Sequence, residues 1–352
     1  NMKILVTILT TNNLELLEMC YKSVAEQKHT KLRYSVVIIV NTLDPAYASK
    51  VKEKAKEKFE TVIDIVETQS NGKPGLGHNS ALDYYRDQIS GKGEEGYTHL
   101  VPLDGDDVLY PYAFSRLEKY LEYCPDVLMF GYTDILAYNY RRSMIHYVIN
   151  GECYLYYNNF VKDMRKVWLN AKLSPFAHNI NDTNTAGRLF LLSSEAAGSS
   201  WGLAYNEDLR WYDDTSVFLQ IFEKSGERES NFRIFMLDDK DMYLYNKLND
   251  DSVSINFNSG DVLKKRAEEE DIFRKSVENK YLGIREWDLG GIKFLGGVET
   301  KEFGVREKIE FCEDLVGRMN RRKADKIEGE MEIFLKYAQD NDIVEMKKIY
   351  EK

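Results

Sequence analysis

The segment Asp104-Gly105-Asp106-Asp107 places three carboxylates within four residues. Carboxylates at this spacing repel one another unless a cation or water neutralises them. Carboxylate oxygens are the ligands that Mg²⁺ and Mn²⁺ prefer, and proteins often share these ions with substrate phosphates. The segment therefore predicts a divalent-cation site. The alternative is a plain acidic turn in which Asp107 caps the following helix.

A glycine-rich segment, residues 71–77, precedes the acidic segment in the chain. Glycines let backbone amides approach an anion closely, and Lys73 adds positive charge. The segment matches neither the phosphate-loop pattern nor the dinucleotide-binding pattern, so a plain turn is an equally good interpretation. Asn79, just inside the following helix, is placed either to bind a ligand or to cap that helix.

A second acidic pair, Asp213-Asp214, follows two aromatic residues and opens a helical pattern. Such a pair could supply a general base or could simply cap the helix. Glu207-Asp208 is a rival pair. No serine-nucleophile elbow and no Cys/His signature is present, so covalent hydrolysis has no support.

The histidines and cysteines show no metal-binding pattern. We interpret His78, His99, His146 and His178 as structural or surface residues, because their spacing is not that of metal ligands. The four cysteines lie far apart without a CxxC pair, which excludes a zinc finger or disulfide scaffold. A reducing compartment, and hence a cytoplasmic location, is expected. The apolar runs are too short for a membrane-spanning helix.

Composition favours a globular protein that does not coat nucleic acid. The chain has 352 residues, of which 43% are hydrophobic, and a net charge of −10. This acidic balance disfavours general phosphate binding. A basic cluster at residues 318–323 leaves nucleic acid as a possible partner, although a solvated helix face is the favoured interpretation.

Apolar β-branched runs alternate with helical patterns through the first part of the chain. This order predicts an α/β fold with a doubly wound, mostly parallel sheet. In such a sheet, ligands bind beyond the carboxyl ends of the strands, where the polar loops 10–13, 41–44, 71–77 and 104–107 should meet. The expected strands cover residues 3–10, 34–40, 61–67 and 97–103, and the expected helices cover residues 14–27, 46–59, 78–88 and 111–123.

The later part of the chain is less regular. Residues 126–132 read as a further strand, residues 138–172 as an insertion rich in Tyr and Asn, and residues 261–352 as mainly helical. We therefore expect one domain over residues 1–260. Its nucleotide-sugar half would be about 1–132 and its acceptor half about 133–260. The helical C-terminal region 261–352 has no assigned role.

Several segments resemble family-2 glycosyltransferases, which have the GT-A fold. The opening strand, loop and helix of that family are similar to ILVTILTTNNLELLEMCYKSVAEQ (residues 4–27). The second strand, the glycine-rich segment and the DxD segment are similar to YSVVIIVNTLDP, NGKPGLGHNSALDYY and YTHLVPLDGDDVLYPYAFSRLEKYLE. The later regions resemble NTAGRLFLLSSEAA, WYDDTSVFLQIFEKSG and YLYNKLNDDSVSINF. The resemblance spans residues 3–257, and the DxD segment is its most specific part.

The resemblance implies a role for each matching residue. Asp106 and Asp104 would bind Mn²⁺ or Mg²⁺, and Asp214 or Asp213 would deprotonate the acceptor. The nucleotide sugar would be bound by Thr10, Asn12, Asn41, Asp44, Lys73, Asn79, Asp104 and Gly105. Two positions depart from the family. Asn41 stands where an acid often holds the nucleotide base, and the acidic pair is Asp-Asp instead of Glu-Asp.

The activity implied is a metal-dependent, inverting glycosyltransferase, either hexosyl or pentosyl. It would move a sugar from a nucleoside-diphosphate sugar to a hydroxyl acceptor, which is a glycan or a modified nucleobase of viral DNA. The alternatives are a nucleotidyl- or phosphotransferase on a similar fold and a non-catalytic glycan-binding relative.

Overall fold

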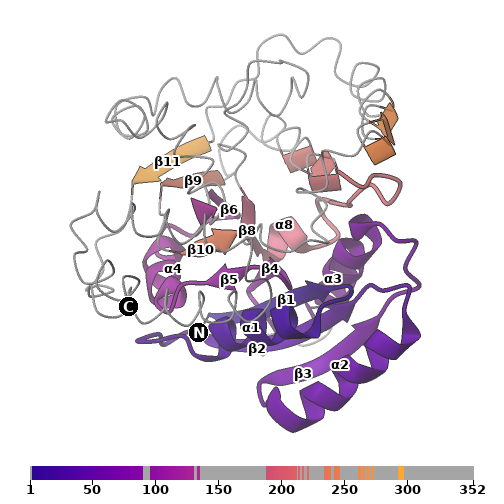
Figure 1. Ribbon diagram of the computed structural model, residues 1–352. Helices are drawn as coiled ribbons and strands as arrows, with labels where there is room; N and C mark the ends of the chain where they lie inside the picture. The colour runs from indigo at the N-terminus through magenta and orange to yellow at the C-terminus, as the bar shows by residue number, and fades with distance from the viewer. Residues whose placement is uncertain are drawn as a thin grey trace, which may run out of the picture.

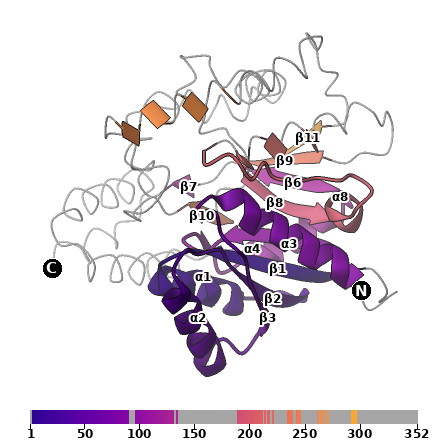
Figure 2. The same ribbon diagram turned by 90° about the vertical axis from the view of Figure 1, so that its right-hand side faces the viewer.

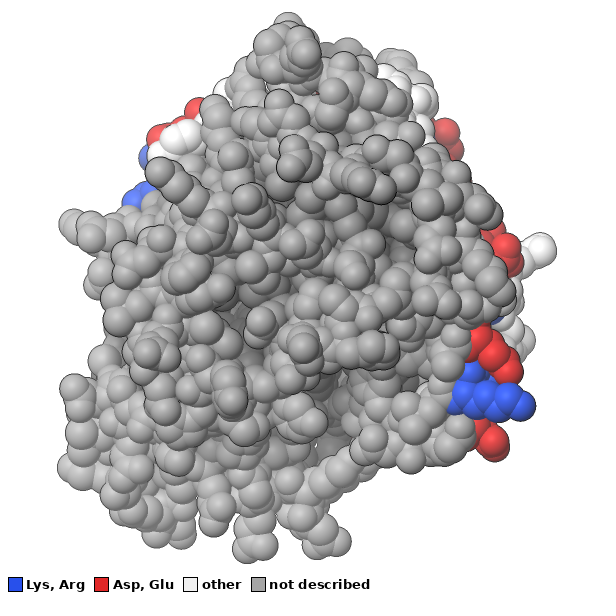
Figure 3. Space-filling model, turned by 90° about the horizontal axis from the view of Figure 1, so that it is seen from above, with Lys and Arg blue, Asp and Glu red and all other residues white. Residues whose placement is uncertain are grey.

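The computed structural model describes most of the N-terminal part of the chain and shorter pieces beyond it. The described residues are 2–89, 96–130, 133–134, 188–211, 213–214, 216–217, 220–221, 234–238, 242–245, 261–262, 264–265, 268–269, 272 and 292–296. The expectations for residues 138–172 and for the basic cluster 318–323 lie outside this set. Where described residues reach the surface in Figure 3, basic and acidic side chains lie side by side.

The main sheet has eight strands in the order β11-β9-β6-β8-β4-β1-β2-β3, with β3 and β11 at its two edges (Figure 1). Strand β8 runs antiparallel to its neighbours β4 and β6, whereas the other pairs are parallel. The mostly parallel sheet that the sequence predicts is confirmed. The strands are β1 (Lys3–Thr10), β2 (Arg33–Val40), β3 (Val62–Glu67), β4 (His99–Asp104), β6 (Val127–Phe130), β8 (Arg188–Ser193), β9 (Ile234–Asp238) and β11 (Ile292–Gly296).

Helices cover both faces of the sheet, so the fold is doubly wound as predicted (Figures 1 and 2). The helices are α1 (Leu14–Ala25), α2 (Pro45–Lys58), α3 (Pro74–Ile89), α4 (Ala113–Leu121) and α8 (Ser194–Ala197). Successive side chains of a strand point to opposite faces. Ile4, Val6 and Ile8 of β1 accordingly pack with α1, α2 and α4, whereas Leu5 and Leu9 pack with α3 and α8.

Two details differ from the sequence prediction. The helix α3 begins at Pro74, so half of the expected glycine-rich loop is its first turn. Proline suits this position because a first-turn residue needs no intrahelical N–H bond. Strand β11 pairs with β9 in the main sheet although it lies beyond residue 260, where we expected mainly helix. The domain boundary at residue 260 stays a prediction.

A small second sheet lies beside the end of β4. It consists of β5 (Val108–Leu109), β10 (Tyr243–Tyr245) and β7 (Thr133–Asp134) in the order β5-β10-β7. Because β5 follows the acidic segment directly, this sheet anchors one side of it. None of the helices in the described part of the chain combines the length and the apolarity that a bilayer crossing demands.

Protonation of His99 should destabilise the fold in mild acid. Burial lowers the pKa of this side chain from 6.5 to about 4. Between these values an unfolded chain binds a proton at His99 that the native state does not bind, so stability falls as the pH drops and then levels off below about 4. The loss should reach about 3 kcal/mol.

Denaturant unfolding of the wild type and of His99→Gln at pH 7, 5.5 and 4.5 measures this contribution. The difference in free energy of unfolding between the two proteins should change by most of that amount between pH 7 and pH 4.5. This comparison separates His99 from the carboxylates that titrate in the same range, because both proteins contain them. A constant difference would contradict the prediction.

Candidate functional site

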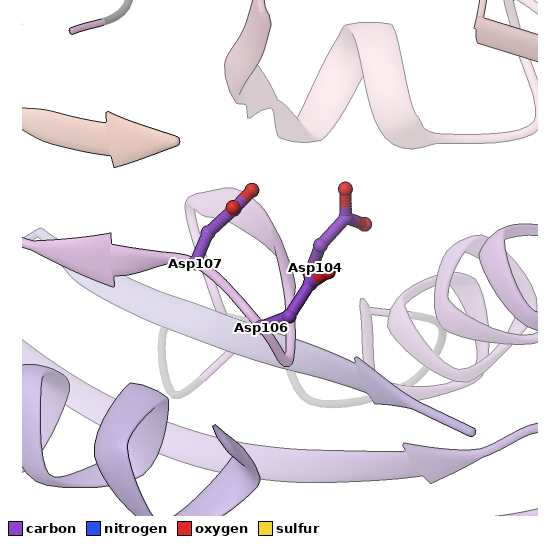
Figure 4. Close-up of side chains that lie close together, drawn as sticks. All are labelled: Asp104, Asp106 and Asp107. Atoms are coloured by element: carbon purple, nitrogen blue, oxygen red, sulfur yellow. The ribbon is translucent and has the colours of Figure 1, made fainter. Parts of the chain in front are cut away.

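The three aspartates of the acidic segment form one cluster at the carboxyl end of β4. One carboxylate oxygen from each of Asp104, Asp106 and Asp107 lies within 4.8 Å of the other two (Figure 4). The backbone N–H of Asp107 donates to the carbonyl of Asp104 at 3.1 Å and closes the turn. Three hard oxygen donors at this separation fit a divalent cation such as Mg²⁺ or Mn²⁺.

Gly105 allows this turn to lie directly against the end of β1. Its N–H donates to the carbonyl of Leu9 at 2.6 Å. A Cβ at this position would come within 2.7 Å of the same Leu9 oxygen, a distance that real Cβ atoms essentially never show. A side chain at position 105 would therefore push the acidic turn away from the strand end.

Asp107 and the residues beneath the turn are firmly held. The hydroxyl of Tyr243 in β10 donates a short hydrogen bond to Oδ2 of Asp107, which is 1% exposed. Below the turn, the buried thiol of Cys20 donates to the carbonyl of Asp104 at 3.5 Å. Burial, together with the carboxylates of Asp107 and Asp106, raises the pKa of Cys20, so it stays an uncharged thiol.

His78 links the acidic turn to the second acidic pair. Its Nε2 lies 3.8 Å from Oδ1 of Asp104 and 3.8 Å from Oδ2 of Asp213. The imidazole stacks on the ring of Tyr205, with centroids 4.5 Å apart. Asp213 is buried, whereas Asp214 is exposed. The structure thus brings Asp213 to the histidine that also faces Asp104 of the turn.

Our sequence interpretation missed His78 as a site residue. Spacing between histidines was the wrong signal, because the partners of His78 are carboxylates far away in the sequence. Its position directly after Gly77 in the glycine-rich segment was the only sequence feature that could have indicated it. The segment occupies the carboxyl edge of the sheet, where the acidic turn also lies.

Lys73 and Asn79 hold the loop 203–211 in place. The backbone N–H of Tyr205 donates to the side-chain oxygen of Asn79 at 2.6 Å, and the Asn79 amide donates back to the Tyr205 carbonyl at 2.9 Å. Nζ of Lys73 donates to the carbonyl of Asp208 at 2.7 Å. Their nucleotide-binding roles stay predictions, but these contacts show that both residues bind the loop 203–211.

The remaining candidates lie at the ends of β1 and β2. Thr10 is buried and shares a short hydrogen bond with Tyr47. Asn41 is also buried: its amide donates to the carbonyl of Lys73 at 2.9 Å, and its oxygen accepts from the hydroxyl of Thr68 at 2.6 Å. Asn41 therefore links the end of β2 to Thr68, just after β3, and to Lys73, just before α3.

Asn12 and Asp44 are exposed at the same edge of the sheet. The hydroxyl of Thr11 donates to Oδ1 of Asn12 at 3.3 Å, and Asp44 caps α2 by accepting from the N–H of Ala46 at 2.9 Å. Capping satisfies an amide at the start of the helix that would otherwise lack a partner. The nucleotide-binding roles assigned to both residues stay predictions.

Comparison with known proteins gives similarity at the level of structure. No family model matches the sequence, and no curated protein matches it. Residues 1–349 of S. aureus TarS in complex with UDP-GlcNAc align with a TM-score of 0.44 and 15% identity over 99% of this chain and 91% of that one. The mannosyltransferase PcManGT from Pyrobaculum calidifontis, in complex with GDP-Man and Mn²⁺, aligns with a TM-score of 0.43 and 14% identity over 80% and 70% of the two chains.

A longer S. aureus TarS structure aligns with a TM-score of 0.42 and 16% identity. The alignment covers 97% of this chain but only 54% of that one, so the present chain spans about half of the longer protein. Nucleotide sugars are named in two of these structures, UDP-GlcNAc in one and GDP-Man in the other. Identities this low transfer no residue role, so the chemistry of the site rests on the chain's own side chains.

Loss of one carboxylate should weaken cation binding by the acidic turn. Asp106→Ala is expected to weaken Mn²⁺ binding by about tenfold or more, because affinity for hard cations depends on the number of charged oxygen ligands. Paramagnetic resonance of free Mn²⁺, with no nucleotide present, measures the affinity directly. Asp83→Ala is the matched control, because Asp83 is an exposed acid on α3. Equal Mn²⁺ affinities for the two variants would contradict the site.

Proposed function

We propose that the chain is a metal-dependent glycosyltransferase that moves a sugar from a nucleoside-diphosphate sugar to a hydroxyl acceptor. The observation that supports this most is the presence of two distinct sets of carboxylates in one site. The acidic turn offers a cluster of oxygen donors, and Asp213 offers a separate carboxylate near the same nitrogen of His78 that faces Asp104. A metal-dependent, inverting sugar transfer uses both, one for the leaving diphosphate and one for the acceptor hydroxyl.

The acidic turn is suited to the diphosphate of the donor. Asp104 and Asp106 would hold a Mg²⁺ or Mn²⁺ ion together with phosphate oxygens, and the buried Asp107 would support them from below. When bound, such an ion offsets the negative charge that develops on the departing nucleoside diphosphate. Gly105 contributes by keeping this turn against the end of β1.

Asp213 is suited to act as the general base. A base must lie close to the acceptor hydroxyl, which in turn must lie close to the sugar carbon. Asp213 satisfies this requirement better than Asp214, because it is buried beside the acidic turn and Asp214 is exposed. Direct attack by the deprotonated hydroxyl displaces the diphosphate from the opposite side of the sugar carbon, so the reaction inverts that centre.

His78 would hold the acidic turn and Asp213 at a fixed position relative to each other. Its imidazole contacts both Asp104 and Asp213, and stacking on Tyr205 restricts rotation of the ring. The carboxylates of Asp104 and Asp213 would thereby keep a defined separation. Fixing reacting groups in this way removes a large part of the entropic barrier to a two-substrate reaction.

The rival activities predict different products. A nucleotidyltransferase would use the same acidic turn but would release pyrophosphate, and a glycan-binding relative would turn over no donor. The separate carboxylate at Asp213 favours sugar transfer to a hydroxyl. A glycan is the proposed acceptor, and the free cysteines Cys20 and Cys124 suit a cytoplasmic location. UDP-GlcNAc and GDP-mannose are the first donors to test.

Replacing the proposed base should slow transfer without removing donor binding. We expect Asp213→Asn to lower turnover by about 100-fold or more, in the range observed for loss of a general base, and Asp214→Asn to lower it by less than about tenfold. The assay follows release of nucleoside diphosphate from UDP-GlcNAc or GDP-mannose with Mn²⁺ present, and calorimetry follows donor binding.

Three further outcomes of this assay are informative. Release of pyrophosphate in place of a nucleoside diphosphate would establish the rival activity. Turnover by Asp106→Ala at the wild-type rate after removal of metal with a chelator would contradict the proposed function. A greater loss in Asp214→Asn than in Asp213→Asn would move the base to Asp214.

A further inference from the structure

The chain beyond residue 260 contacts the segment that carries the proposed base. Oε1 of Glu269 accepts hydrogen bonds from the backbone N–H groups of Arg210 and Trp211, both at 2.7 Å. The described residues from 261 to 272 are helical, and Glu269 is half-buried there while its neighbour Glu268 is exposed. One carboxylate thus binds two consecutive amides from a point nearly sixty residues further along the chain.

These two amides occupy a critical place in the site. Trp211 lies two residues before Asp213, which is helical. Hydrogen bonds from backbone amides to an ionised carboxylate are stronger than those between neutral groups. A negative charge in front of a helix N-terminus is also favoured by the helix dipole. Glu269 is therefore well placed to fix the direction in which this helix begins.

The other contacts of this loop hold its two flanks. On the N-terminal side, Asn79 and Lys73 of the α3 region bind Tyr205 and Asp208. On the C-terminal side, the hydroxyl of Ser216 donates to the carbonyl of Asp213 and accepts from the N–H of Asn206. Between these flanks, Glu269 binds the stretch that leads into Asp213.

We propose that Glu269 is a positioning residue that sets the placement of the Asp213 carboxylate relative to the acidic turn. This inference rests on the proposed function, since it assigns Asp213 the role of base. It also gives the region beyond residue 260 a part in the activity, for which the sequence indicated none. In the part of the chain that the structure describes, the hydrogen bonds of Glu269 go to the backbone of Arg210 and Trp211 and not to the acidic turn.

A positioning role should change turnover but not binding, whereas a loss of folding would change both together. In the proposed function, donor and cation binding depend on the acidic turn, and the described hydrogen bonds of Glu269 do not reach it, so the donor KM and the Mn²⁺ affinity should stay within about twofold of the wild type. The kcat should fall by about tenfold or more, because a small displacement of a catalytic group slows the reaction steeply.

The test compares the wild-type chain with Glu269→Ala, Glu269→Gln and the matched control Glu268→Ala. Hydrogen exchange of the Arg210 and Trp211 amides, kinetics with UDP-GlcNAc or GDP-mannose, and Mn²⁺ affinity are measured for each protein. In Glu269→Ala we expect amide exchange to accelerate by about tenfold or more, with the kcat loss given above. Glu269→Gln keeps an acceptor oxygen and should recover part of both, and Glu268→Ala should match the wild type.

The outcomes distinguish this inference from the proposed function. Equal exchange rates and equal kcat in Glu269→Ala and Glu268→Ala would overturn the positioning role alone. A parallel loss of kcat, Mn²⁺ affinity and thermal stability in Glu269→Ala would also overturn it, because that pattern is general destabilisation. Absence of turnover in the wild type with every nucleotide sugar would overturn the proposed function and the inference with it.

Discussion

Mutual repulsion among the aspartates at the end of β4 is the constraint on which the site depends. Three carboxylate oxygens lie within 4.8 Å of one another, and a fourth acid, Asp213, contacts the same histidine as Asp104. Like charges at this distance are unfavourable without compensation. The surrounding residues supply it in part, since Tyr243 donates a hydrogen bond to Asp107. A bound cation would supply the remainder.

Close backbone approach is the second requirement, and glycines meet it. Gly105 lets the acidic turn abut β1, and Gly75 of α3 lets the loop 203–211 approach so closely that an added Cβ would lie 2.7 Å from the carbonyl of Asn206. Gly77 instead leaves room for the side chains of Leu9 and Asn41. At Gly105 and Gly75 the neighbouring segments therefore approach main chain to main chain, which leaves no room for a side chain at either glycine.

The sequence predicted those parts of the molecule that depend on local patterns. The unbroken apolar runs of β1 and β2 indicated strands buried on both faces, and their alternation with helices placed the acidic segment at the carboxyl edge. The features that the sequence analysis missed depend on contacts between segments far apart in the chain. His78, Tyr243 and Glu269 acquire their places through partners that lie up to 136 residues away. Neither residue type nor spacing encodes such partners. Pro74 was a local signal for the start of α3 that our interpretation did not use.

The antiparallel strand β8 has a consequence for synthesis of the chain. On one side β4 pairs with β1, which has already been made, but on the other side residue 99 pairs with residue 193. A nascent chain that has just left the ribosome therefore exposes one edge of β4 until roughly ninety further residues have been translated. Unpaired strand edges recruit other strands. Slow translation between β4 and β8 would thus favour aggregation, and the yield of folded protein should depend on the rate of elongation through that stretch.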